Sequence, residues 1–108
     1  MVGDELVIER RTENGKPVLS CTGEIYIATE EKFRQHLDEV ISEGHGQFSI
    51  DLGGVHFLSS TFFNEVLRLI GAHPKVKITC LTRPEHDRIF KIVRFEKVVA
   101  TTRAFTTS

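Results

Sequence analysis

The sequence lacks the features that mark exported, membrane-bound and nucleic-acid-coating proteins. It has no apolar run long enough to cross a bilayer, and no secretory signal peptide opens it. Its 14 basic residues nearly balance 15 acidic ones, which argues against a main task of coating nucleic acid or an anionic membrane. We therefore expect a cytoplasmic protein that binds neither nucleic acid nor membrane directly.

Cysteine is also scarce. Cys21 and Cys80 are the only two, each stands among strand-forming residues, and no C-x-x-C pair occurs. In a reducing compartment such thiols usually act as small buried hydrophobic groups. The sequence predicts two free, buried thiols in preference to a disulfide.

Motifs for catalysis and metal binding are missing as well. The five histidines form no H-x-x-x-H or H-E-x-x-H pattern, which disfavours a zinc site. Neither G-x-G-x-x-G nor a P-loop occurs, so Gly53-Gly54 is interpreted as a turn after a strand. No glycine frames the serines as a G-x-S-x-G nucleophile elbow requires. We expect no enzyme activity, no metal and no cofactor.

The sequence does contain alternating strand and helix patterns. Its 108 residues are about the length of one domain. Asn14-Gly15 separates two apolar runs, which predicts a hairpin over 5–23. Apolar residues at helical spacing predict helices over 29–43, with Thr29 as N-cap and Gly44 at the exit, and over 61–72. Further patterns predict strands in QFSIDL, KVKITCL and KVVAT and a third helix beginning at Pro84.

The order β-β-α-β-α-β-α-β predicts a single α/β domain over 1–108. Strands that alternate with helices need crossovers, so the sheet should be mixed and mainly parallel, with helices packed on it. The apolar pattern also predicts the core. Its expected buried members are Ile50, Leu52, Phe63, Leu67, Ile78 and Ile89.

Three adjacent hydroxyls, Ser59, Ser60 and Thr61, stand at the junction between a predicted strand and the second helix. Ser59 or Ser60 can cap the helix, a contribution of about 1 kcal/mol. Phe62 and Leu69 lie about a quarter-turn from the predicted apolar stripe of this helix. They either pack under a neighbouring helix or form an exposed docking patch beside Ser60.

The segments CTGEIYIAT and IDLGGVHFLSSTFF, with the order of elements, resemble the STAS domain family, and more narrowly its bacterial anti-sigma factor antagonists. In that family a D-L-x-x-V-x-F/Y-hydrophobic-D-S-S/T-G-L segment ends a strand, and a partner kinase phosphorylates its first serine. The resemblance covers residues 5 to 101. The residues that match this segment are Asp51, Leu52, Val55, Phe57 and Leu58.

The resemblance places Ser60 at the phosphoacceptor and Thr61 at the second hydroxyl, the fallback acceptor. It implies an anti-sigma factor that is also a serine kinase of the GHKL ATPase type, bound by the unphosphorylated domain. Three departures from the family pattern stand out. Ser59 replaces the acid before the phosphoacceptor, Phe62 replaces the glycine two positions after it, and Arg94 replaces a glycine common at the end of the third helix.

The partner-binding residues implied in this way are Ser59, Ser60, Thr61, Phe62 and Leu69. Two other interpretations stay open. One is a non-switching STAS scaffold of the stressosome kind, in which the hydroxyls serve only as caps. The other is a STAS domain that binds a nucleotide or lipid in a surface groove.

Overall fold

The computed structural model describes residues 6–104, so Glu5 at the start of the predicted hairpin lies outside them. The predicted order of strands and helices is confirmed. Three short 3₁₀ helices join them, Ile27–Thr29, Pro84–His86 and Phe95–Lys97. The main elements are β1 (Leu6–Glu13), β2 (Lys16–Ile25), α1 (Glu30–Ser42), β3 (Gln47–Leu58), α2 (Ser60–Ala72), β4 (Lys77–Thr82), α3 (Asp87–Ile92) and β5 (Ala100–Arg103).

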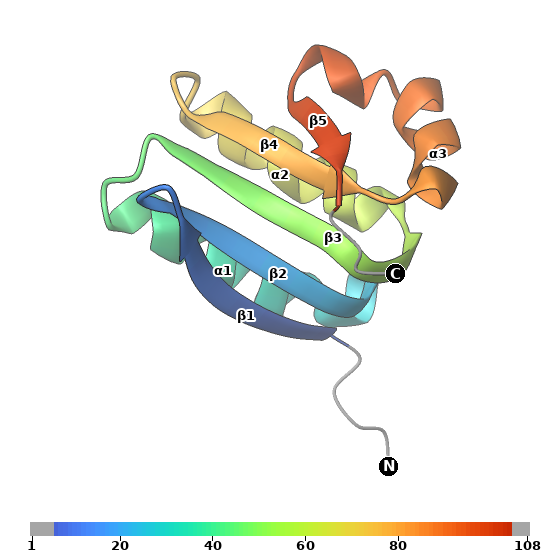
Figure 1. Ribbon diagram of the computed structural model, residues 1–108, viewed down its shortest axis with the longest axis horizontal. Helices are drawn as coiled ribbons and strands as arrows, with labels where there is room; N and C mark the ends of the chain where they lie inside the picture. The colour runs from blue at the N-terminus through green and yellow to red at the C-terminus, as the bar shows by residue number, and fades with distance from the viewer. Residues whose placement is uncertain (1–5, 105–108) are drawn as a thin grey trace.

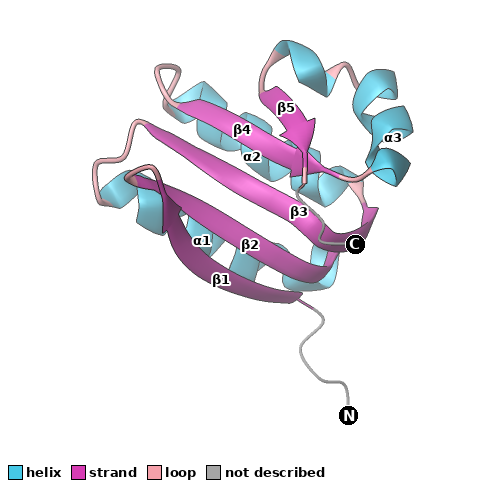
Figure 2. Cartoon of the chain, viewed as in Figure 1, coloured by secondary structure: helices cyan, strands magenta, loops and turns pink. Residues whose placement is uncertain are grey.

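The five strands form one sheet in the order β1-β2-β3-β4-β5. β1 runs antiparallel to β2, and each later pair of neighbours is parallel, because a helix carries the chain back between them. Figures 1 and 2 show α1 and α2 lying along the same face of this sheet, with α3 beside its β5 end. Parallel strands end at one edge, so the segment after β3 lies at the edge where β2 ends.

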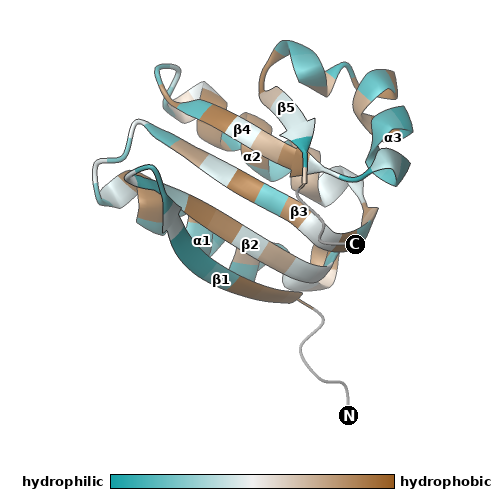
Figure 3. Ribbon diagram, in the orientation of Figure 1, coloured by the Kyte–Doolittle hydropathy of each residue, from teal (hydrophilic) through white to brown (hydrophobic). Residues whose placement is uncertain are grey.

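The β1–β2 hairpin follows from its turn residues. Asn14 and Gly15 both have positive φ, 54° and 77°, as a two-residue type I′ turn requires. A positive φ also ends α1. There Gly44 has φ 91°, and its N–H donates to the carbonyl of Ile41. Figure 3 shows hydrophobic residues concentrated on the central strands, whereas the half of β1 near the turn is hydrophilic.

The prediction of a turn at Gly53-Gly54 is wrong, because β3 continues through both glycines to Leu58. The register between β2 and β3 shifts after Ser20, and Gly54 then pairs with Thr22. A Cβ on Gly54 would lie 2.7 Å from Thr22 Oγ1 and 2.9 Å from the Cys21 carbonyl oxygen. Glycine is needed here for close strand approach at an irregular ladder.

The last strand begins later than predicted. Residues 95–97 form a 3₁₀ helix, and β5 covers Ala100–Arg103 instead of 97–101. The chain enters that 3₁₀ helix through Arg94, which has φ 57° and ψ 36°. This left-handed conformation explains why glycine is common at the corresponding family position.

Most of the predicted core is confirmed. Ile50, Leu52, Phe63 and Ile78 are buried, and both cysteines are free and buried. Ile89 is partly buried, packed against the core. The prediction for Leu67 is wrong, since its side chain is 45% exposed.

The reason lies in how α2 faces the sheet and α1. Its most buried residues are Phe62, Val66 and Leu69, at positions i, i+4 and i+7. This stripe is rotated by one residue from the predicted one, which turns Leu67 outward. Phe62 is the anchor, because its ring contacts the rings of Phe33, Phe63, Phe90 and Phe95 at centroid separations of 5.1–6.2 Å.

α3 is joined to the sheet by a buried histidine. His86 Nε2 lies 2.6 Å from the carbonyl oxygen of Val55 in β3, and the Arg83 N–H donates to His86 Nδ1. These contacts fit the neutral ring with its proton on Nε2. Burial lowers the pKa of His86, which favours the same state.

Candidate functional site

The three hydroxyls meet at the edge of the sheet where β3 passes into α2. Ser59 is the N-cap of α2, and its Oγ accepts a hydrogen bond from the Thr61 N–H at 3.2 Å. The same hydroxyl donates to the carbonyl oxygen of Ile25, the last residue of β2, at 2.9 Å. One side chain therefore caps the helix and ties the helix start to the neighbouring strand. The capping interpretation is confirmed for Ser59.

Ser60 is the first residue of α2 and is exposed. Among residues 6–104, none forms a hydrogen bond with its hydroxyl. The hydroxyl lies at the positive end of the helix dipole, where N–H groups of the first turn lack partners within the helix. It is therefore accessible to another protein and is not required for capping.

Thr61 differs from Ser60 in exposure. Its side chain is buried, with 8% exposed. A kinase must reach the hydroxyl that it modifies, so Thr61 is a poor fallback acceptor in the folded domain. Of the two hydroxyls predicted as acceptors, the fold presents Ser60.

The structure contradicts an exposed docking patch made by Phe62 and Leu69. Both side chains are fully buried, and Phe62 occupies the centre of the phenylalanine cluster. The alternative prediction, that they pack beneath neighbouring elements, is confirmed. The glycine expected at position 62 is thus replaced by a core residue and not by a surface contact.

Other apolar side chains, which sequence reasoning missed as surface residues, lie exposed around this junction. Ile27 is 73% exposed just after β2, and Phe57 is 57% exposed two residues before Ser59. Leu67 lies two turns along α2 from Ser60, on the same side of the helix. Phe57 pairs in register with Glu24, next to the end of β2. We call Ile27, Phe57 and Leu67 the apolar rim. The rotation of α2 is what turns Leu67 outward.

Behind the junction, a buried carboxylate joins α2 to α1. Glu65 is 3% exposed and accepts hydrogen bonds from Arg34 in α1 and from Arg68 in α2. The Arg34 guanidinium is the main reason that the pKa of Glu65 is lowered to about 2. Arg68 also pairs with Asp38 of α1. The site thus rests on a helix pair whose relative position is held by charge-assisted bonds.

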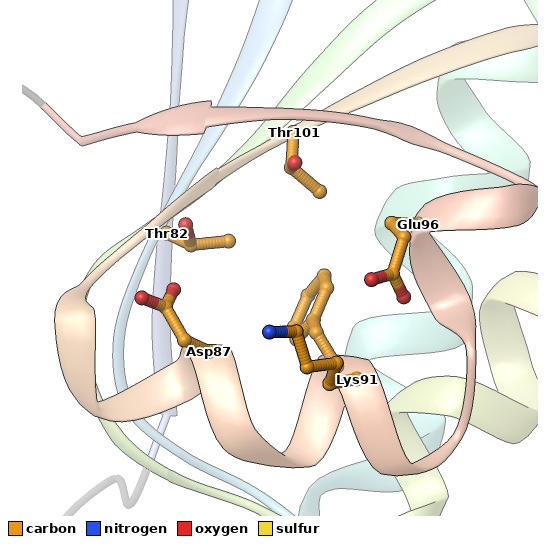
Figure 4. A pocket seen from close by; sticks show the side chains of 6 residues that line it. Thr82, Asp87, Lys91, Glu96 and Thr101 are labelled. Carbon is orange, nitrogen blue, oxygen red and sulfur yellow. The ribbon is translucent and has the colours of Figure 1, made fainter.

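A small polar cavity lies between α3, β4 and β5. Its volume is about 180 Å³, below the 300–1,000 Å³ typical of pockets for drug-sized ligands. In Figure 4, Asp87, Lys91 and Glu96 surround it together with Thr82 and Thr101. Asp87 is already paired with Arg103.

No group of three or more histidine, cysteine or acidic residues in 6–104 is arranged to hold a metal ion. Over the same range, no helix is long and apolar enough to span a membrane.

Comparison with known proteins identifies the family. The STAS domain model matches residues 7–104, nearly the whole chain. The protein therefore belongs to the STAS domain family, as the sequence predicted. Searched by sequence, the curated proteins give no significant match.

Solved structures of anti-sigma factor antagonists share the fold. An anti-sigma factor antagonist from Mycobacterium paratuberculosis superposes with a TM-score of 0.80 at 20% identity, over 89% of this chain and 84% of that one. Unphosphorylated SpoIIAA, an anti-sigma factor antagonist, gives 0.68 at 13% identity, over 89% and 88%. An uncharacterised protein from Shewanella loihica with a SpoIIAA-like fold gives 0.61 at 15% identity, over 99% and 92%.

Proposed function

We propose that this domain is a cytoplasmic anti-sigma factor antagonist, switched off by phosphorylation of Ser60. In its unmodified form it binds an anti-sigma factor that is also a serine kinase of the GHKL ATPase type. The observation that carries the proposal is that the two serines at the start of α2 have different roles. Ser59 makes the capping bonds, and Ser60 presents an exposed hydroxyl that the fold does not need.

The same geometry explains why modification changes binding and leaves folding intact. A phosphoserine adds between about −1.5 and −2 charges, which the helix N-terminus favours by about 0.3–1 kcal/mol. A docked partner responds differently, because burying an unmatched dianion costs several kcal/mol. Each ~1.4 kcal/mol lowers affinity tenfold. The phosphorylated domain stays folded and releases its partner.

The apolar rim supplies the binding energy for the partner. Ile27, Phe57 and Leu67 expose apolar surface at the edge where Ser60 stands, and a partner seated over them faces the hydroxyl. Aromatic residues at the centre of an interface often dominate its affinity. Phe57→Ala should therefore weaken binding by about 1–3 kcal/mol. Val7→Ala, a truncation of an exposed residue on β1, is the matched control and should leave affinity unchanged.

The test uses a GHKL-type serine kinase from the same organism. The domain is incubated with the kinase and ATP, the modified residue is mapped by mass spectrometry, and affinity for the kinase is measured before and after by calorimetry. We expect a phosphate on Ser60, none on the Ser60→Ala variant, and affinity reduced tenfold or more. A phosphoprotein mapped to Ser60 that binds as tightly as the unmodified form would show that the hydroxyls are caps alone.

A further inference from the structure

Charge is unevenly distributed along this nearly neutral chain. Residues 75–98 carry seven basic and three acidic residues, whereas the remaining positions carry seven basic and twelve acidic ones. The segment covers β4, α3 and the turn that leads into β5. This segment is therefore basic, although the net charge of the chain is −1.

The cations of this segment differ in their pairing from the arginines elsewhere in the chain. Arginines elsewhere bind carboxylates, as Arg10 does Glu43 and Arg34 does Glu65. Within the described part of the chain, six cations of the segment have no ion-pair partner. They are Lys75, Lys77, Arg88, Lys91, Arg94 and Lys97, all of them exposed.

Two of these lysines line a groove of about 590 Å³ in which polar and aliphatic side chains alternate. The groove lies at the beginning of β4, the end of the sheet opposite to Ser60. β5 pairs with β4 only from Thr79 onward, so the outer edge of Lys77 and Ile78 has no strand beside it in the described chain. Its lining consists of Gln47, Pro74, Lys75, Val76, Lys77, Ile78, Thr79, Val98 and Ala100.

On the side away from β4, the groove is lined by Val98 and Ala100. Val98 is 45% exposed, directly after Lys97 and the 3₁₀ helix that Arg94 begins. Ile92 and Val93, at the end of α3, are also exposed but do not line the groove. Exposed aliphatic groups gathered beside cations can serve as contacts for a partner that is both apolar and acidic.

We propose that this basic groove binds an acidic, apolar segment of a second protein partner. Leucine-like side chains of the segment fill the floor between Val76 and Val98, and its carboxylates face Lys75 and Lys77. The charge of the groove selects an acidic segment. Its concave shape and its aliphatic side chains between lysines favour a peptide over a flat lipid surface. None of its nine lining residues is aromatic, so a nucleic-acid base has no ring to stack on.

A second copy of this chain fits the groove less well. Its acidic surface lies elsewhere on the molecule, so a contact between copies would be head-to-tail. Such contacts build rings or open filaments in place of a closed pair. The groove is also remote from Ser60, so its occupancy does not depend on the phosphorylation proposed above.

The test measures fluorescence anisotropy of a labelled short peptide of alternating glutamate and leucine. We expect saturable binding that weakens with salt, and no binding of a matched lysine–leucine peptide. Lys75→Glu and Lys77→Glu should each weaken binding about tenfold or more, and Val98→Ser severalfold. Lys16→Glu reverses an exposed lysine on β2 that has no ion-pair partner among residues 6–104. It is the control and should change affinity less than about threefold.

Circular dichroism establishes that each variant is folded. Three results would overturn the proposal: no peptide binding, equal binding by the groove variants and the control, or tighter binding of phosphatidylserine vesicles or duplex DNA than of the peptide. The proposal would also be overturned if the domain alone associated in a concentration-dependent way and Lys75→Glu abolished this association. That result would assign the groove to a second copy of the chain. Phosphorylation at Ser60 is read out separately, so failure here leaves the proposed switch untouched.

Discussion

Arg34 of α1 donates two hydrogen bonds to the Glu65 carboxylate of α2, one from Nη2 at 2.7 Å and one from Nε at 3.1 Å. The carboxylate is buried, whereas the guanidinium is 44% exposed at its side chain. The pair therefore keeps a buried charge satisfied and sets the spacing of the two helices that support the Ser60 edge.

Removal of Arg34 should destabilise the domain. In Arg34→Gln the Glu65 carboxylate stays buried with Arg68 as its only cation. We therefore expect a larger loss in the free energy of unfolding than breaking an exposed ion pair causes. Arg10→Gln breaks the exposed pair with Glu43 and serves as control, with an expected loss below about 1 kcal/mol. Urea denaturation measures both. Equal losses of unfolding free energy in the two variants would mean that the buried position of Glu65 does not make its ion pair more important for stability.

The same pair makes stability depend on pH. The folded domain lowers the pKa of Glu65 to about 2 from an ordinary 4.5. A carboxylate with a lowered pKa stabilises the fold fully above its ordinary pKa, and this contribution disappears as pH falls from about 4.5 to about 2. The slope of unfolding free energy against pH in this range should be smaller in Glu65→Gln than in the wild type. Identical slopes would assign the acid lability to other groups.

The two serines should differ in their effect on stability. Ser59→Ala removes the cap of α2 and the bond to the Ile25 carbonyl, so we expect a loss of about 1–2 kcal/mol. Ser60→Ala should change the unfolding free energy by less than about 0.5 kcal/mol, and Ser60→Asp should fold at least as well. Thermal and urea unfolding of the three variants test this. A larger loss for Ser60→Ala than for Ser59→Ala would reverse the roles assigned here.

Arg94 holds a left-handed conformation that suits glycine. Arg94→Gly should raise the unfolding free energy by about 1 kcal/mol, because it removes the Cβ clash at φ 57°. Arg94→Ala removes the charge but keeps the Cβ clash, so it should not stabilise the domain. It therefore separates the effect of backbone strain from the effect of losing the charge. Asn14→Gly, at φ 54°, is a second control with little expected gain, since asparagine tolerates this conformation. Equal effects of glycine and alanine at position 94 would exclude strain.

The thiols should be unreactive in the folded protein. Burial raises the pKa of Cys21 to about 12, and it also raises the pKa of Cys80. Since the thiolate is the reactive form, labelling by a thiol reagent should be slow in the native state and fast in urea. The rate is followed by mass spectrometry. Rapid native labelling of both would be incompatible with their burial in β2 and β4.

Local features of the sequence determined the order of elements and most of their positions. Asn14-Gly15 specifies its turn through backbone φ alone, and helical spacing marks α1 and α2 wherever they pack. The STAS resemblance rests on the same local pattern, and the match over residues 7–104 agrees with it. These features can be predicted from the sequence because they depend on residues that are close together along the chain.

Tertiary contacts decided the rest. With apolar residues at 62, 63, 66, 67, 69 and 70, helical spacing left two stripes nearly equal; the phenylalanine cluster selected the one through Phe62 and exposed Leu67. β3 continues through Gly53 and Gly54 because β2 approaches closely there, and no local pattern encodes that approach. Ser59 and Ser60 are alike as residues. Only the Ile25 carbonyl at the end of β2 made the first the cap, which left the second free at the surface.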